Sequence, residues 1–349
     1  MSDAPADRDA GGTGKLRRLT IAKAMNEAIA QEMRRDESVF VMGEDLGALG
    51  GIWASTQGLL DEFGAERVRD TPISETAFIG AAVGASAVGM RPIVELMFVD
   101  FFGVCFDAIY NLAAKQAYFS GGNVSCPMVL MTSVGGGYSD AGQHSQCLYA
   151  SFAHMPGLKI VSPSNAYDAK GLMVAAIRDP NPVVFMGHKA LQGMGWLGTA
   201  KGSLADVPDT LYTVPIGKAA VVREGGDITL IGWASTVHTA LAAADALAKQ
   251  GVSAEVVDVR TLAPLDMETV LKSVRKTGRV IVVDEDYATC GLASEIVARI
   301  ARESFSDLRS APGMVTYGDV PPPFARNLEQ ALIPSVDTVV EMAARQVAP

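Results

Sequence analysis

The fold is decided by residues 71–98, TPISETAFIGAAVGASAVGMRPIVELMF, where a helix is followed by a strand. Glu75 begins the predicted helix, and Ser74 is its predicted side-chain cap. The run from Ala77 to Met90 is dominated by Ala and Gly and is too short to cross a bilayer, so we predict a tightly packed interior helix. The apolar run from Ile93 to Phe98 then predicts a buried strand.

The same alternation of helices and strands extends to both sides of this stretch. Before and after it, further strands are predicted at 39–42, 128–131, 160–161 and 183–185, and helices at 20–35, 102–117 and 166–178. Thr20 is the predicted cap of the first of these helices. A second series places strands at 228–231, 254–259, 280–283 and 314–317, and helices at 237–249, 267–277, 293–302 and 328–332. Such alternation favours α/β domains, each with a mainly parallel sheet covered by helices.

Composition limits the class of protein. The chain has 349 residues, of which 49% are hydrophobic and 19% charged, so it can bury two cores. The net charge of -10 argues against a nucleic-acid or anionic-membrane partner. The four cysteines stand singly, without the spacing of a zinc site or a disulfide framework, and the polar N-terminus lacks the apolar core of a secretory signal. We therefore expect a cytoplasmic protein.

Two residues could carry chemistry. Glu75 is either a first-turn carboxylate that favours the helix dipole or a partly buried carboxylate that hydrogen-bonds a ligand nitrogen. His144 follows a glycine-rich loop between a strand and a helix, where open α/β sheets place ligands, but a lone histidine is often a capping or packing residue. The sequence holds neither a P-loop, nor a dinucleotide fingerprint, nor a hydrolase elbow.

Several ordered motifs together resemble one enzyme family. The chain is similar to the β subunit of the first component of pyruvate, branched-chain and acetoin dehydrogenase complexes over nearly everything after residue 18. The matching motifs are Gly43-Glu44-Asp45, Asp70-Thr71-Pro72-Ile73-Ser74-Glu75, Arg91-Pro92-Ile93-Val94-Glu95, Gln143-His144-Ser145-Gln146, Phe152-Ala153-His154-Met155-Pro156-Gly157, Pro163-Ser164-Asn165-Ala166-Tyr167-Asp168, Asp179-Pro180-Asn181-Pro182, Asp258-Val259-Arg260-Thr261-Leu262 and Asp319-Val320-Pro321-Pro322-Pro323.

The resemblance implies a transketolase-like architecture. It implies a pyrimidine-binding domain at 19–200 and a transketolase C-terminal-like domain at 216–349. The polar N-terminal residues predict a disordered tail at 1–18, and a stretch that contains Gly and Pro predicts a linker at 201–215. In this family two α and two β chains assemble, and thiamine diphosphate lies between α and β, with its aminopyrimidine on β and its diphosphate and Mg²⁺ on α. The Gly-Asp-Gly that begins the diphosphate site of related enzymes is absent from this sequence. A lipoylated acyltransferase core protein is the implied acyl acceptor.

The resemblance also assigns roles to single residues. Glu75 would hydrogen-bond the pyrimidine ring nitrogen and activate the cofactor, Phe101 would pack near the pyrimidine, and His144 would support acyl transfer to the lipoyl arm. Some members hold a structural potassium ion in the region matching Ala176, Asp179 and Asn181. A plain turn is the alternative interpretation there.

The substrate, a 2-oxoacid or acetoin, is left open because Trp53, Asp140 and Met194-Gly195-Trp196 depart from the family pattern. Two rival hypotheses remain at this point. One is a transketolase-type enzyme that acts without a lipoyl partner, and the other is a subunit retained only for assembly or regulation.

Overall fold

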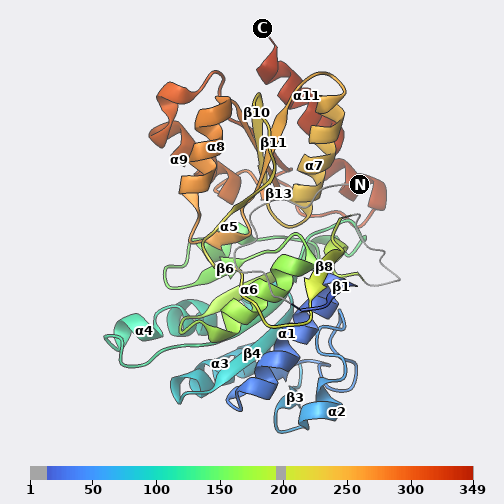
Figure 1. The fold of residues 1–349 in the computed structure, drawn as a ribbon. Helices are drawn as coiled ribbons and strands as arrows, with labels where there is room; N and C mark the ends of the chain where they lie inside the picture. The colour runs from blue at the N-terminus through green and yellow to red at the C-terminus, as the bar shows by residue number, and fades with distance from the viewer. Residues whose placement is uncertain (1–13, 194–201, 349) are drawn as a thin grey trace. The chain divides into compact units, whose positions relative to one another are not determined.

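The computed structural model describes residues 14–193 and 202–348 (Figure 1). These residues form two compact units. The N-terminal unit lies within Ala10–Gly135 and Ser151–Ile216, and the C-terminal unit lies within Gly136–Ala150 and Gly217–Pro349. The segment Met194-Gly195-Trp196 lies outside the described residues.

The N-terminal unit contains a parallel sheet with the strand order β6-β7-β5-β4-β2-β3. Gly43 in β2 lies opposite both Asp70 in β3 and Glu95 in β4, which fixes the register of three neighbouring strands. The strands are β2 (Val39–Gly43), β3 (Val68–Asp70), β4 (Arg91–Phe98), β5 (Val129–Val134), β6 (Lys159–Val161) and β7 (Val183–His188). Parallel pairing requires crossover connections, and the helices supply them.

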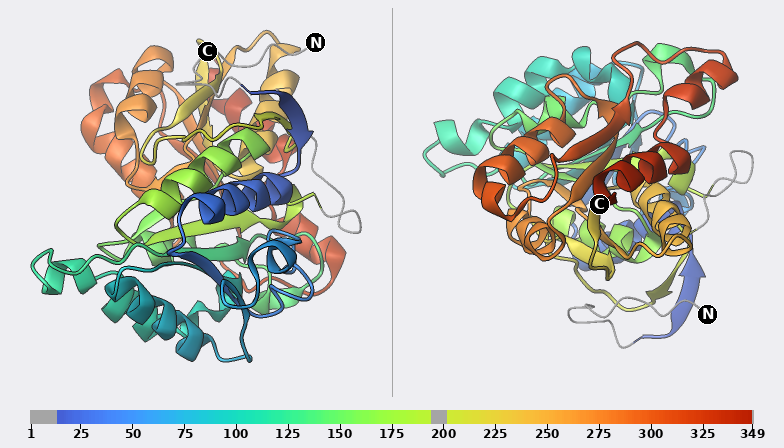
Figure 2. Two further views of the ribbon diagram at one scale, coloured as in Figure 1. Left: turned by 60° about the horizontal axis from the view of Figure 1, so that its bottom comes forward. Right: turned by 90° about the horizontal axis from the view of Figure 1, so that it is seen from above.

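Helices cover this sheet. The principal ones are α1 (Ile21–Arg35), α3 (Glu75–Ala87) and α6 (Ala166–Arg178), with a short α2 (Leu59–Phe63) and α5 (Tyr149–Ala153) elsewhere in the chain. Helices α1 and α6 pack against each other and run side by side in Figure 2. The predicted cap of α1 is confirmed, because Thr20 Oγ1 accepts a hydrogen bond from the Lys23 backbone N–H at 3.3 Å.

A small antiparallel pair was not predicted. Strand β1 (Leu16–Leu19) pairs with β8 (Ala205–Pro208), so residues 16–18 are not a disordered tail and residues 201–215 are not only a linker. The two strands have four residues each, too few to show a clear period of two in the sequence. The predicted domain division at 201–215 itself stays a prediction.

The predicted helix at 102–117 is wrong as a single element. The chain instead forms a 3-10 helix at Val99–Gly103, a π-helical segment at Ala108–Ala113 and a short α4 (Gln116–Phe119). The Ala114 backbone N–H donates to the Ile109 carbonyl at 3.0 Å, a wider turn than an α-helix makes. Asp107 and Asn111 still lie on one face of this stretch, since the Asn111 amide donates to the Asp107 carboxylate at 2.6 Å.

The C-terminal unit contains a second sheet with the strand order β14-β13-β10-β11-β9. All of its pairs are parallel except that of β9, at the edge, with β11. The elements are β9 (Ala220–Arg223), β10 (Ile228–Gly232), β11 (Ala254–Asp258), β12 (Thr261–Ala263), β13 (Val280–Tyr287) and β14 (Gly313–Tyr317), with α7 (Ser235–Ala248), α8 (Met267–Thr277), α9 (Leu292–Glu303), α10 (Arg326–Leu332) and α11 (Val336–Val347). The predicted fold class, two mainly parallel α/β domains, is confirmed.

Strand β4 carries a buried acid. Glu95 lies between Val94 and Leu96 and is only 4% exposed. Burial and the neighbouring charge of Glu44 raise the pKa of Glu95 to about 8. Within the described part of the chain, its Oε2 atom has no hydrogen-bond partner. The folded protein therefore holds a neutral carboxyl group at neutral pH.

This raised pKa predicts a pH dependence of stability. An unfolded glutamate titrates near pH ~4.3, so between roughly pH 5 and 8 the folded state keeps a proton that the unfolded state releases. The stabilisation is fully present below the pKa that Glu95 has in the unfolded chain. It is lost as the pH rises through the pKa that Glu95 has in the folded protein. In that window, the proton on Glu95 should make the free energy of unfolding of the wild type fall by about 1.4 kcal/mol per pH unit. Glu95→Gln should lack this contribution to the slope.

Urea unfolding of the wild type and the variant at pH 5, 6 and 7 measures this difference. Glu66→Gln is the matched control, because the Glu66 side chain is 97% exposed and should leave the slope unchanged. Equal slopes for wild type and Glu95→Gln would contradict the burial of a protonated carboxyl group.

Candidate active site

The carboxyl ends of β2, β3 and β4 lie at one edge of the N-terminal sheet, and candidate residues follow each of them. Glu44 follows β2, the segment to Glu75 follows β3, and Phe101 follows β4. The Thr71 backbone N–H donates to the Gly43 carbonyl at 2.9 Å, which ties the segment leading to Glu75 to the end of β2. This edge is where open α/β sheets bind ligands.

Glu75 is the first residue of α3, as predicted, and it is half-buried. The predicted side-chain cap is wrong, because Ser74 Oγ donates to the Pro72 carbonyl at 3.1 Å and makes no hydrogen bond to the helix. Glu75 is the acidic residue in the first turn of α3, the end of a helix that favours a carboxylate.

Glu75 belongs to an acidic cluster that the sequence analysis did not identify as a site. Burial, and then the charge of Glu75, raise the pKa of Glu44, and Glu44 in turn raises that of Glu95. Among the described residues, Glu44 Oε1 is buried without a hydrogen-bond partner. The signal in the sequence was a glutamate inside an apolar strand, which is rarely buried without a functional reason.

Phe101 lies in the 3-10 turn that follows β4. Its ring meets that of Phe98 edge-on, with 5.7 Å between the centroids. The next residues are tied to the start of α3, because Thr76 Oγ1 donates to the Val104 carbonyl at 2.6 Å. The turn that carries Phe101 and the helix that begins with Glu75 are therefore joined by a hydrogen bond.

His144 lies in the C-terminal unit, within the segment Gly136–Ala150. The segment contains positive φ angles at Gly137 (98°), Ser139 (61°) and Ala141 (59°), so its path is tightly constrained. A 3-10 turn at Ala141–Gln143 leads into His144, whose side chain is half-buried. Glu75 and His144 belong to different compact units.

Two acids that contact the histidine-bearing loop were also missed. Glu285, in β13, accepts a hydrogen bond from the Gly136 backbone N–H at 2.8 Å, and Glu329, in α10, accepts from Gly137 and Ser139. These residues are far apart in sequence, and no local pattern links them. Only the tertiary structure could have identified them.

The proposed potassium ligands form a compact turn. The Asp179 carboxylate accepts from the Asn181 backbone N–H at 2.9 Å and pairs with Lys159 Nζ at 2.5 Å, and the Ala176 carbonyl accepts from the Asp179 backbone N–H. Both carboxylate oxygens are thus engaged by protein groups, which suits a plain turn. The potassium site stays a prediction.

Within residues 14–193 and 202–348, no helix is long and apolar enough to span a membrane. Over the same residues, no cluster of three or more His, Cys, Asp or Glu side chains has the arrangement of a metal site.

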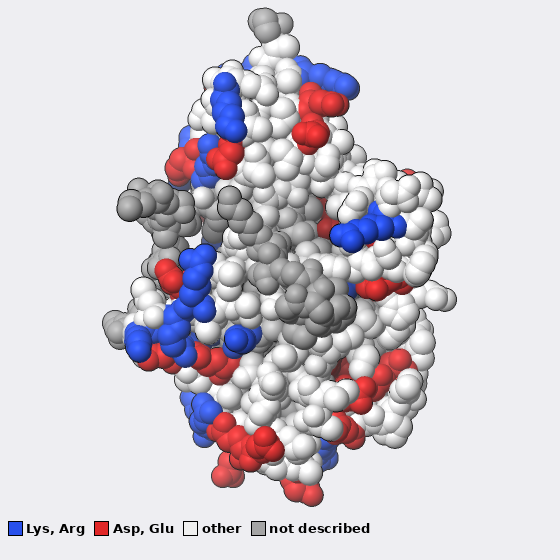
Figure 3. All heavy atoms as spheres, turned by 90° about the vertical axis from the view of Figure 1, so that its right-hand side faces the viewer, with Lys and Arg blue, Asp and Glu red and all other residues white. Residues whose placement is uncertain are grey.

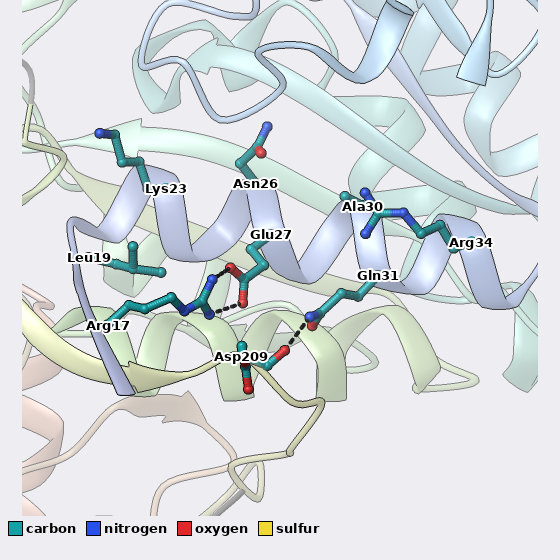
Figure 4. Close-up of a pocket in the computed structure, with 9 residues that line it drawn as sticks. All are labelled: Arg17, Leu19, Lys23, Asn26, Glu27, Ala30, Gln31, Arg34 and Asp209. Carbon is teal, nitrogen blue, oxygen red and sulfur yellow. Dashed lines mark hydrogen bonds and ion pairs between the residues drawn. The ribbon is translucent and has the colours of Figure 1, made fainter. Parts of the chain in front are cut away.

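A separate hollow of about 440 Å³ lies along α1 (Figure 4). Arg17 pairs with Glu27 across it at 2.6 Å, and Lys170, which is fully buried, also contacts Glu27 at 2.6 Å. Burial opposes ionisation, but hydrogen bonds from Arg17 and Lys170 hold the pKa of Glu27 below its usual value. Arg34, which also lines the hollow, pairs with Glu62. On the face drawn in Figure 3, charges of both signs are interspersed. We assign the hollow no function.

Comparison with known proteins agrees with this geometry. Residues 17–193 match the transketolase pyrimidine-binding domain, and residues 217–339 match the transketolase C-terminal domain. A solved split-gene transketolase, an inactive β4 tetramer, shares the fold with a TM-score of 0.76 at 22% identity, covering 94% of this chain and 98% of that one.

Curated relatives are closer in sequence. The β subunit of acetoin:2,6-dichlorophenolindophenol oxidoreductase from Cupriavidus necator is 47% identical, covering 94% of this chain and 97% of the relative. The mitochondrial pyruvate dehydrogenase E1 component subunit beta-2 of Oryza sativa subsp. japonica is 43% identical, covering 98% of this chain and 90% of the relative. With such similarity over nearly its whole length, the chain belongs to the family of β subunits of thiamine-diphosphate-dependent pyruvate and acetoin dehydrogenases.

Proposed function

We propose that this chain is the β subunit of a dehydrogenase that decarboxylates a 2-oxoacid, or cleaves acetoin, and passes the acyl group to lipoamide. The observation that carries the proposal is the position of Glu75 in the first turn of α3, at the carboxyl edge of the sheet and beside Glu44. An α subunit would complete the active site, in an assembly of two α and two β chains. A lipoylated acyltransferase core would receive the product.

The residues at the carboxyl edge suit an aminopyrimidine. When bound, thiamine diphosphate supplies a nucleophilic carbon and an electron sink for the carbon–carbon bond that breaks. Glu75 would hold a proton at the pyrimidine ring nitrogen, which a carboxyl group can either donate or accept. Phe101 would offer an apolar ring beside the pyrimidine, on a turn held to the start of α3 by the Thr76 hydrogen bond. Mg²⁺ and the diphosphate would be held by the α subunit.

His144 would move a proton during acyl transfer to the lipoyl arm. A neutral imidazole has one nitrogen that donates and one that accepts a hydrogen bond, so it can serve as proton donor or acceptor. Its half-buried position at the end of a constrained loop supports a fixed orientation. Much of the acyl pocket should come from the α subunit, so this chain alone does not identify the substrate. All four cysteines are free thiols, which supports the predicted cytoplasmic location.

The identity of the relatives favours this proposal over the transketolase-type alternative. Relatives that cover nearly the whole chain are named as dehydrogenase subunits, whereas the split-gene transketolase shows the fold alone. The presence of both Glu75 and His144 favours a catalytic subunit over one retained only for assembly.

Glu75→Gln should abolish cofactor activation without unfolding the protein. The change keeps the side-chain shape and removes the titrating group, so kcat should fall by at least about 100-fold when the variant is co-expressed with the α subunit. A dye-coupled turnover assay measures the loss, with the exposed Glu66→Gln as the matched control. Near-normal turnover of Glu75→Gln would exclude the proposed role.

His144→Ala should separate two steps of the reaction. Acyl transfer to lipoamide should fall by about 100-fold, while dye-coupled turnover, which needs no lipoyl acceptor, should fall much less. His238→Ala, on α7 of the same unit, is the control. An equal loss in both assays would instead indicate a general structural role for His144.

A further inference from the structure

The glycine-rich loop before His144 is bound by carboxylates rather than shaped to bind phosphate. The backbone N–H groups of Gly137 and Ser139 donate to Glu329 Oε1 and Oε2 at 2.8 and 2.9 Å. Glu329 is completely buried, at 0% exposure. One carboxylate therefore uses both oxygens to hold two backbone positions of the loop.

A second buried acid holds the start of the same loop. Glu285 Oε1 accepts from the Gly136 backbone N–H at 2.8 Å, and Glu285 Oε2 accepts from Ser235 Oγ at 2.8 Å. The two acids approach from different elements, Glu285 from β13 and Glu329 from α10. We call Glu285 and Glu329 together the carboxylate clamp.

The clamp explains why the loop needs glycines. A Cβ atom on Gly136 would lie 3.0 Å from Glu329 Oε1, and Gly137 has a φ of 98° that other residues rarely adopt. At Gly136 the close approach of the Glu329 carboxylate disfavours a side chain, and at Gly137 the backbone conformation does so. These glycines therefore serve an internal contact.

The far end of the loop is fixed as well. The Gln146 side-chain amide donates to the Gly142 carbonyl at 3.1 Å, and the Tyr287 hydroxyl donates to Gln146 Oε1 at 3.2 Å. In the sequence, His144 lies between Gly142 and Gln146 and follows the residues that the clamp holds. Its own backbone N–H donates to the Ala141 carbonyl at 3.3 Å. Displacement at Gly137–Ser139 would therefore move the turn that carries the imidazole.

We propose that Glu329 is a positioning residue, which sets the orientation of His144 by holding the loop at Gly137 and Ser139. This inference rests on the proposed function of His144. Hydrogen bonds from N–H groups to a carboxylate are stronger than neutral ones, and losing the acceptor would leave buried N–H groups unpaired. Glutamine offers only one acceptor oxygen, and its amide N–H₂ would face the second loop N–H.

The test compares Glu329→Gln, His144→Ala and the double variant, each co-expressed with the α subunit, in the lipoamide acyl-transfer assay. Glu329→Gln should lower acyl transfer roughly 10-fold, the effect of one lost charged hydrogen bond. In the His144→Ala background it should cost less than about 2-fold, because a residue that acts through His144 adds nothing once the imidazole is gone. Glu341→Gln, at an exposed position on α11, is the matched control and should leave transfer unchanged.

Hydrogen exchange provides a readout of the loop itself. Mass spectrometry of a peptide spanning residues 136–146 should show faster exchange in Glu329→Gln and unchanged exchange in Glu341→Gln. If Glu329→Gln does not assemble with the α subunit, Glu329→Asp keeps a carboxylate that reaches less far, and it should show the same pattern with smaller losses.

The outcomes separate this inference from the proposed function. Normal acyl transfer in His144→Ala alone would overturn the role of His144, and the inference with it. A damaged His144→Ala together with a fully active Glu329→Gln would overturn only the inference. The inference would also be overturned if the fold-losses of acyl transfer in the two single variants multiplied in the double variant. That result would show that Glu329 acts on the fold and not through His144.

Discussion

The parallel register of β2, β3 and β4 is the constraint on which the rest of the proposed site depends. Because Gly43 lies opposite both Asp70 and Glu95, β2 and β3 end level with each other, while β4 continues to Phe98. The residues that follow the three strands therefore lie at the carboxyl ends of one parallel sheet. A shift by one residue in any strand would turn its side chains to the other face and separate the acidic cluster. The backbone hydrogen bonds between the strands thus determine which residues meet at this edge of the sheet.

Buried carboxyl groups then perform different tasks according to their partners. One carboxyl oxygen of Glu95 has no hydrogen-bond partner among the described residues, and burial together with a neighbouring acid keeps Glu95 protonated at neutral pH. Glu27, which pairs with Arg17 and Lys170, stays ionised. Glu329 meets two backbone N–H groups and fixes a loop. The same functional group is thus an uncharged acid, a salt-bridge partner or a structural anchor, and the surroundings decide which.

The parts of the fold that follow from local pattern could be predicted from the sequence. Helix α6 spans the predicted residues 166–178, and Thr20 caps α1 as expected, because helical spacing and capping are local signals. The predictions that failed concern elements too short to show a pattern, or departures from regular geometry that the pattern does not record. The pair of β1 and β8 is too short to show a period, and the helix predicted at 102–117 is interrupted by a π-helical segment that helical spacing does not reveal.

The residues of the candidate site also fall into those that the sequence could identify and those that only the tertiary structure shows. Glu75, Phe101 and His144 could be named because a family resemblance pointed to them, and the structure places the first two at one edge of a single sheet. Glu44 and Glu95 carried a weak signal, and the clamp carried none, since Glu329 meets its loop only through the tertiary fold.

The central claim is that this chain provides half of a shared cofactor site. Calorimetry of thiamine-diphosphate binding in the presence of Mg²⁺, for the chain alone and for the chain co-expressed with its α subunit, tests it most directly. The account predicts binding by the assembled pair and none by the chain alone. Tight binding by the chain alone, or no binding by either, would contradict it.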